Sequence, residues 1–302
     1  MGYNWGMASR PVFVVSEEPP FYREEIVEFR WLKGRSFKAA KTNSENLRNA
    51  ALEKGISIYE ISRVGERYSK LSAFKLLVKA KSDLILPLEI VYQYAKLWEG
   101  ELESTPFDTL PLSARGVKGS RASKKEARER GKGKQLKGFQ INFGYGEKID
   151  FPHKPEDAFY NWLYITTLRQ RHNQKIHEDL LLLLRSDDHM AIGFSDIFFV
   201  PMGKKVIRYN CQAKAVAQYL SIYRFYREKI EDIFPITNSL YEVRAQLRSL
   251  FSRFVQLAYP SYSESSSPGV PVSCGDTEHH VNPNPNEIIS SKTGDVQLTL
   301  FL

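Results

Sequence analysis

The chain has 302 residues, 42% of them hydrophobic and 13% aromatic, and a formal net charge of +8, which leaves room for one large core or two modest ones. No apolar run approaches the roughly 18 residues of a membrane-spanning helix, and the N-terminus lacks the pattern of a secretory signal. The two cysteines, Cys211 and Cys274, exclude a disulfide framework or a zinc cluster, so we expect a cytoplasmic protein with no metal and no other cofactor.

The N-terminal region is predicted to form a small α/β layer over residues 8–66. Strands are expected at 11–15, 25–31 and 56–61, and Pro19-Pro20 indicates a turn between the first two. Residues 43–54 have the pattern of a short helix, which Gly55 can terminate.

A helix is predicted over residues 87–98, after a strand at 75–79, because Pro87 suits a first helical position. A buried face is indicated by apolar residues at helical spacing, namely Leu88, Val91, Tyr92, Ala95 and Trp98. Glu89, Gln93 and Lys96 follow at i, i+4 and i+7 and share a neighbouring face. From geometry alone, these three side chains form either the rim of a pocket or a surface Glu–Lys pair worth roughly 0.2–0.5 kcal/mol.

The positive charge is concentrated in a basic segment, residues 113–138. Between Ser113 and Lys137, ten Lys or Arg side chains are opposed by only two carboxylates, so the rest of the chain is neutral overall. Such a block is either a solvated loop or a contact for a polyanion such as nucleic acid. Ser123 and Glu126 match a capping box for a helix over 123–130. The candidate nucleic-acid contacts are Arg115, Lys118, Arg121, Lys124, Lys125 and Arg128.

The second half of the chain is predicted to be mainly helical. Helices are expected over 155–171, from Asn173 to Arg185, after a cap at Asn210, and over 240–255. The five leucines at 180–184 are apolar all round, which indicates central core. Residues 187–209 are expected to be loop and short strand, and they include Asp196. The predicted fold class is therefore α+β.

The composition changes after Tyr259. Residues 260–296 contain five prolines and almost no large apolar residues, which predicts a disordered linker over 259–296. An apolar peptide, residues 297–302, follows it. We therefore expect the layer at 8–66, a main domain at 67–258, the linker and this terminal peptide.

The order of several motifs resembles NADAR (YbiA-like) domains. These motifs are Leu71-Ser72-Ala73-Phe74, Glu89-x-x-Tyr92-Gln93-x-x-Lys96, Ser123-x-x-Glu126-Ala127, Asn161-Trp162, Arg171-His172-Asn173 and the small-residue helix after Asn210. Residues 8–228 are most similar to the NADAR-type antitoxins encoded beside DarT-type DNA ADP-ribosyltransferases. The resemblance implies a mainly helical domain and an N-glycosidase that removes ADP-ribose from a modified nucleobase, guanine, in DNA. Its partners would be ADP-ribosylated DNA and the DarT-type toxin.

The resemblance also implies roles for single residues. Glu89 matches the catalytic Glu, whose carboxylate stabilises positive charge on the ribose or activates water. Lys96 matches the active-site Lys, which could pair with Glu89, bind a phosphate or attack an opened ribose as an amine. Asp196 is a second candidate catalytic carboxylate, unless it is only a turn former. The candidate ligand-binding residues are Gln93, Tyr92, Trp98, Trp162 and Asn210.

Alternatives accompany these assignments. Trp98 and Trp162 could stack on a base or serve only as core aromatics, and Asn210 could be only a helix cap. The chain departs from the family pattern at Ile90, at Ala73 and at Phe198-Phe199, which puts substrate contacts nearby in doubt. A non-catalytic antitoxin of the same fold and a small-molecule ribosyl N-glycosidase are the alternative functions.

The terminal peptide carries a separate signal. Gln297, Leu298, Leu300 and Phe301 resemble the Q-L-x-L-F peptide with which bacterial replication proteins dock on the DNA sliding clamp. A flexible linker that ends in such a peptide suits tethering. The alternatives are a stray apolar end and a strand that docks on its own domain.

Overall fold

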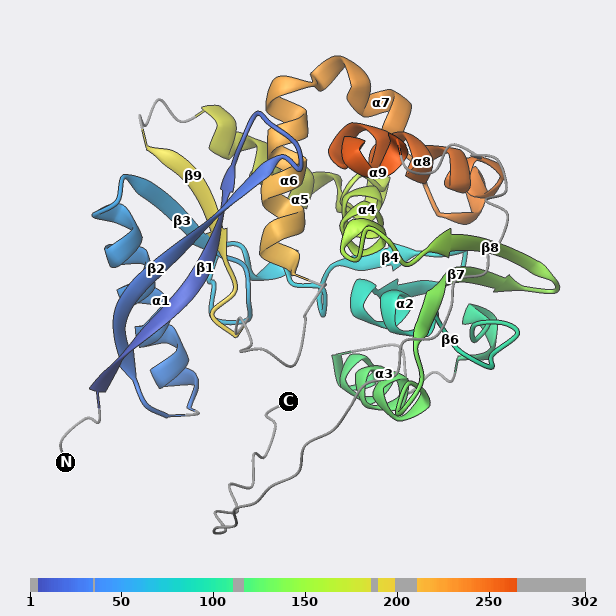
Figure 1. Ribbon diagram of the computed structural model, residues 1–302, viewed down its shortest axis with the longest axis horizontal. Coiled ribbons are helices and arrows are strands. Elements are labelled where there is room, and N and C mark those ends of the chain that lie inside the picture. The colour runs from blue at the N-terminus through green and yellow to red at the C-terminus, as the bar shows by residue number, and fades with distance from the viewer. Residues whose placement is uncertain (1–4, 35, 111–116, 186–189, 199–210, 265–302) are drawn as a thin grey trace, which may run out of the picture. The chain divides into compact units, whose positions relative to one another are not determined.

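The structure, a computed structural model, describes residues 5–34, 36–110, 117–185, 190–198 and 211–264 (Figure 1). Its N-terminal layer is a four-stranded sheet in the order β2-β1-β9-β3. β1 (Trp5–Val15) and β2 (Tyr22–Leu32) form a long antiparallel hairpin, whereas β3 (Ile56–Glu60) pairs in parallel with β9 (Ala191–Ser195). Because β9 lies between β1 and β3, a strand from the second half of the chain completes the N-terminal layer.

α1 (Phe37–Leu52) covers one face of this sheet, and α6 (Gln212–Phe225) packs on the other (Figure 1). α1 begins at Phe37 rather than at residue 43, because the Ser36 hydroxyl accepts a hydrogen bond from the Ala39 amide at 3.1 Å and caps the helix. The core beneath α1 consists mainly of Val12, Val14, Val27, Phe29, Leu47, Ala51, Ile56 and Ile58.

Two smaller sheets flank α2 (Leu88–Tyr94). Their strands are β4 (Leu77–Lys79), β5 (Ile85–Pro87), β6 (Lys96–Trp98), β7 (Leu136–Gly144) and β8 (Glu147–Pro152). β4 and β5 form a hairpin that leads into α2, and β6 pairs with the β7–β8 hairpin, which was not predicted. The predicted helix over 87–98 is therefore wrong at its C-terminal end, where the chain continues as a strand.

α4 (Ala158–Leu168) lies at the centre of the main core, since all of its residues are buried. It contacts α2, α6 and α8 (Leu247–Ala258). The leucine run at 180–184 is more peripheral than predicted: Leu180 is fully buried, but Leu182 is 46% exposed. This happens because α5 (Gln174–Leu181) ends inside the run and the chain continues as a 3₁₀ turn.

The predicted helix over 240–255 is divided in two. A 3₁₀ segment, Tyr241–Gln246, precedes α8 and has non-helical backbone angles at Val243. Described structure also extends past the predicted start of the linker, because Tyr259 is buried and Pro260–Glu264 form α9. The rest of the linker and the peptide at 297–302 lie outside the described residues.

The remaining helical elements are short connections. They are η1 (Ser69–Leu71), η2 (Phe107–Thr109), η4 (Arg171–Asn173), η5 (Leu182–Arg185), η6 (Arg227–Lys229) and α7 (Ile230–Ile233). The helix α3 (Val117–Arg130) is longer and packs against α2. The combination of sheets with separate helices confirms the predicted α+β class. Within the described ranges, no helix has both the length and the apolar character needed to cross a membrane.

Candidate active site

α2 is a buried helix with a carboxylate in its first turn. Every residue from Leu88 to Tyr94 is buried, and Glu89 is only 2% exposed. The Glu89 amide donates to the Ala73 carbonyl at 3.0 Å, which fixes the start of the helix on the turn that precedes β4. A buried carboxylate is costly unless other groups compensate its charge, so its partners define the chemistry of this site.

The predicted polar stripe forms one hydrogen-bonded network. The Gln93 amide nitrogen donates to Glu89 Oε1 at 2.8 Å, and the Gln93 amide oxygen accepts from Lys96 Nζ at 2.8 Å. Gln93 therefore joins an acceptor to a donor, which determines the orientation of its amide. The structure thus brings Glu89, Gln93 and Lys96 together even though Lys96 lies in β6 rather than in the helix.

Lys96 has an ammonium group that is easier to deprotonate than an exposed one. Burial lowers the pKa of Lys96 to about 8. The negative charge of Glu89 raises this pKa, whereas the positive charges of Lys124, Arg128 and Arg130 lower it further. At pH 7, roughly one Lys96 side chain in ten is a neutral amine on this basis. A neutral amine is a nucleophile, whereas a charged one can only pair or donate.

Two of the predicted ligand-binding aromatics surround Lys96. Its Nζ lies 4.9 Å from the centre of the Tyr92 ring and 5.9 Å from the centre of the Trp98 ring. Gly131 keeps the space for Trp98, because a Cβ there would come within 2.5 Å of the indole. Tyr92 and Trp98 therefore position the amine, whatever else they contact.

α3 packs on α2 and brings basic side chains to the site. Lys124 Nζ lies 3.5 Å from Glu89 Oε1. The predicted capping box is wrong, because Ser123 lies inside the helix and donates to the Ser120 carbonyl, while Glu126 accepts a hydrogen bond from the Tyr94 hydroxyl at 2.6 Å. Ser123 therefore makes a contact within α3, and Glu126 links α3 to α2; neither caps the start of a helix.

The other candidate nucleic-acid contacts of the basic segment are either exposed on α3 or lie outside the described residues. Arg121, Lys125 and Arg128 are exposed on α3. Arg115 and the side chain of Lys118 lie outside the described residues. The exposed cations therefore extend outward from the helix whose Lys124 reaches Glu89.

Asp196 follows β9 and is connected to the same region. Its Oδ2 accepts from the Gln212 amide at 2.9 Å, and the Gln212 amide oxygen accepts from the Ala73 backbone N–H at 2.9 Å. The Ala73 carbonyl in turn accepts the Glu89 amide. This chain of hydrogen bonds ties Asp196 to the backbone at the start of α2, where Glu89 lies. Asp196 Oδ1 also accepts a hydrogen bond from the Phe198 amide at 3.0 Å, as a turn-forming Asp would.

A model of the DarT1-associated NADAR antitoxin family matches residues 8–246. The chain belongs to this family. The resemblance to DarT-associated NADAR antitoxins is thereby confirmed, and the match includes the N-terminal sheet as well as α2, α3 and β9. No curated protein matches the chain.

Glu60 is a carboxylate of this NADAR chain that was not predicted. Burial raises its pKa to about 7, with a further contribution from the nearby charge of Asp196. It accepts hydrogen bonds from the Ser195 hydroxyl at 2.8 Å and from the amide of Ile197. No local signal marks Glu60, because its neighbourhood follows from the parallel register in which it faces Ser195.

Asp157 was also missed as a polar centre. It is 9% exposed and accepts from the Tyr22 hydroxyl and from Lys214 Nζ, each at 3.2 Å. Burial raises the pKa of Tyr92, and the negative charges of Glu89 and Asp157 raise it further. The Tyr92 phenol therefore interacts electrostatically with both carboxylates.

Trp162 and Asn210 are the other two residues predicted to bind the ligand. Trp162 is fully buried and packs against Phe151, Phe159 and Phe251, so it is a core aromatic with no exposed face for a base. Asn210 lies outside the described residues, and the residue that precedes α6 is Cys211. Among the described residues, no three His, Cys, Asp or Glu side chains form a cluster that could hold a metal ion.

Proposed function

We propose that the chain is an N-glycosidase that removes ADP-ribose from a modified nucleobase, guanine, in DNA, and so acts as the antitoxin to a DarT-type ADP-ribosyltransferase. The buried network of Glu89, Gln93 and Lys96 is the observation that carries this proposal. It combines a carboxylate with an amine whose pKa is lowered to about 8. Membership of an antitoxin family supports the biological role.

The chemistry requires a negative group close to the sugar. When the bond between ribose and base breaks, its electron pair leaves with the base nitrogen and positive charge builds on the ribose. Water then supplies a hydroxyl to the anomeric carbon and a proton to the base nitrogen, so the net reaction is hydrolysis. The Glu89 carboxylate stabilises the charge or takes the proton from water, and Gln93 holds it in place.

Lys96 has two roles open to it. As an ammonium group, it binds a phosphate of ADP-ribose or balances the charge of Glu89. As a neutral amine, it attacks the anomeric carbon of the opened ribose while that carbon is still bound to the base nitrogen; the bond to the base breaks, the base leaves with a proton, and water hydrolyses the resulting lysine imine to release ADP-ribose. Asp196 remains a candidate second carboxylate through its connection to the start of α2.

The exposed cations of α3 suit a DNA substrate. Contacts from Arg121, Lys125 and Arg128 to backbone phosphates would supply affinity that does not depend on base sequence. Because Glu89 is only 2% exposed, a modified base must leave its stack to approach the site. We therefore expect single-stranded or flipped nucleotides to be the substrates.

The test is release of ADP-ribose from DNA that a DarT-type toxin has modified. We expect the full chain to release ADP-ribose and Glu89→Gln to reduce the rate at least 100-fold, because the amide cannot offset positive charge. Glu99→Gln, an exposed carboxylate ten residues away, serves as the control and should retain the wild-type rate.

Two outcomes would contradict the proposal. Protection that needs one protein per toxin or per lesion, with no release of ADP-ribose, would indicate a non-catalytic antitoxin. Release from ribosylated metabolites but not from modified DNA would indicate a small-molecule N-glycosidase.

A further inference from the structure

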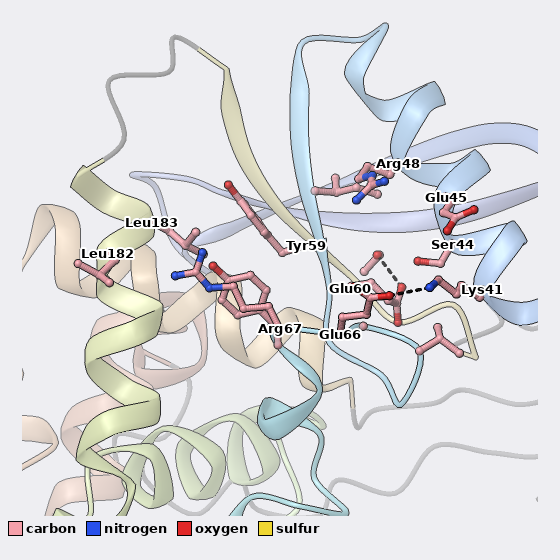
Figure 2. A pocket seen from close by; sticks show the side chains of 15 residues that line it. Lys41, Ser44, Glu45, Arg48, Tyr59, Glu60, Glu66, Arg67, Leu182 and Leu183 are labelled. Carbon is pink, nitrogen blue, oxygen red and sulfur yellow. Dashed lines mark hydrogen bonds and ion pairs between the residues drawn. The ribbon is translucent and has the colours of Figure 1, made fainter. Parts of the chain in front are cut away.

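A cavity of about 560 Å³ lies among α1, β3, the loop after β3 and η5 (Figure 2). Its volume falls within the range of small-molecule sites. Its lining does not include Glu89, Gln93 or Lys96, although it includes Ser195, the residue before Asp196. We call it the α1–β3 cavity.

The cavity lining carries three cations, Lys41, Arg48 and Arg67, and three carboxylates, Glu45, Glu60 and Glu66. Arg48 comes from α1 and Arg67 from the loop after β3, and Figure 2 shows them on either side of Tyr59. Both are exposed, and within the described residues neither forms an ion pair with a carboxylate. Lys41, by contrast, is paired with Glu66 at 2.6 Å. Guanidinium groups bind phosphates in a fixed, forked geometry.

Tyr59 provides a rigid aromatic surface between these cations. It is partly exposed, while its ring packs edge-on against Tyr68 at 5.2 Å and in a tilted arrangement against Phe194 at 5.9 Å. Tyr68 also lines the cavity, and its hydroxyl is buried with no hydrogen-bond partner among the described residues. A held, partly exposed ring beside cations is the arrangement on which nucleic-acid bases stack.

Glu60 adds a titratable group to the wall of the cavity. It lines the cavity together with Ser195, which donates to it at 2.8 Å. With a pKa raised to about 7, first by burial, Glu60 is partly protonated at neutral pH. Both of its oxygens already accept hydrogen bonds, from the Ser62 and Ile197 amides as well as from Ser195, so Glu60 shapes the cavity wall and does not read a base.

We propose that the α1–β3 cavity binds a nucleotide unit, with its base against Tyr59 and its phosphate on Arg48 or Arg67. This site goes beyond the proposed function, because binding there does not depend on cleavage of ADP-ribose. The same chemistry belongs to a free nucleotide and to one residue of single-stranded DNA. Cations on both sides of the ring favour the strand, whose phosphates flank each base.

The experiment compares two charge-matched double variants of the full chain. Arg48→Gln with Arg67→Gln removes both cavity cations, whereas Arg63→Gln with Arg248→Gln removes two exposed cations that do not line the cavity. Calorimetric titration uses deoxyguanosine monophosphate, deoxyguanosine and a 12-nucleotide single strand as probes. Thermal melting confirms that both variants fold.

We expect wild type to bind a phosphate-bearing probe, and the cavity variant to bind it about tenfold more weakly or worse, with less than a twofold change in the control. Binding of the strand alone would identify DNA as the source, and binding of the mononucleotide would identify a free nucleotide. Equal losses in both variants, equal binding of deoxyguanosine and its phosphate, or no binding by wild type would overturn the proposal. ADP-ribose release, measured separately, reports on the active site alone.

Discussion

At the scale of single residues, burial moves two ionisable groups toward neutrality. Taking a charge out of water disfavours the charged form, which lowers the pKa of a lysine and raises that of a carboxyl. The pKa of Lys96 is lowered to about 8 and that of Glu60 is raised to about 7. Both groups therefore change their charge near physiological pH, and each shift leads to a measurable pH dependence.

For Lys96, we predict that kcat/KM for ADP-ribose release rises about tenfold per pH unit below pH 8 and levels off above it, because only the neutral amine is nucleophilic. Lys96→Arg should be inactive at every pH, since a guanidinium does not deprotonate. A pH–rate series with both proteins checks this. A flat profile together with partial activity in Lys96→Arg would instead assign phosphate binding to Lys96.

For Glu60, the sign of the stability effect follows from where the proton is held more tightly. The pKa is about 7 in the folded protein and 4.5 in an unperturbed glutamate, so between these values the folded state binds more protons than the unfolded state. Raising the pH through this window therefore lowers the free energy of unfolding. Glu60→Gln removes the titration, so we expect urea unfolding to show a smaller loss between pH 5 and pH 8.

The control for Glu60 is Glu99→Gln, an exposed carboxylate, which should keep the wild-type dependence on pH. If Glu60→Gln loses as much stability as wild type between pH 5 and pH 8, Glu60 is already ionised at pH 5.

At the scale of elements, the placement of α3 against α2 gives the basic segment two distinct parts. Lys124 faces inward, 3.5 Å from Glu89, and Glu126 anchors the helix through Tyr94. Arg121, Lys125 and Arg128 are exposed. A single helix thus contributes one cation to the site and offers three to a polyanion.

For α3, we predict that replacing Arg121, Lys125 and Arg128 by Gln weakens binding to single-stranded DNA. The slope of log affinity against log salt concentration should fall by about 2, since each lost phosphate contact removes roughly 0.7 from it. Fluorescence anisotropy at several salt concentrations measures this slope. The matched control replaces Lys175, Lys229 and Arg248, which are exposed elsewhere; an equal loss there would show that net charge alone matters.

At the scale of the whole molecule, the terminal peptide at 297–302 stays a prediction from sequence, since it lies outside the described residues. We propose that it tethers the chain to the DNA sliding clamp. Leu298→Ala with Phe301→Ala should abolish binding to the clamp without changing ADP-ribose release, because neither residue is among those proposed for the active site. Thr299→Ala is the control. Surface plasmon resonance on immobilised clamp measures this binding, and undiminished binding by the double variant would refute the proposal.

The sequence by itself was sufficient for features that depend on neighbours along the chain. The β1–β2 hairpin follows from two strand patterns around a proline turn, and the Glu89–Gln93 contact follows from the i, i+4 spacing of one helix. Trp98 and Lys96 were assigned to that helix, but pairing of β6 with β7 draws them into a strand. The contact of Lys96 with Gln93 is nevertheless present.

Only the tertiary structure decided which distant residues meet. Glu60 lies beside Ser195 and Asp196 because β9 inserts between β1 and β3, and Lys124 reaches Glu89 because α3 packs on α2. Asp157 meets Tyr22 and Lys214 for the same kind of reason. These contacts depend on strand register and helix packing between segments far apart in the chain, and local periodicity contains no information about either.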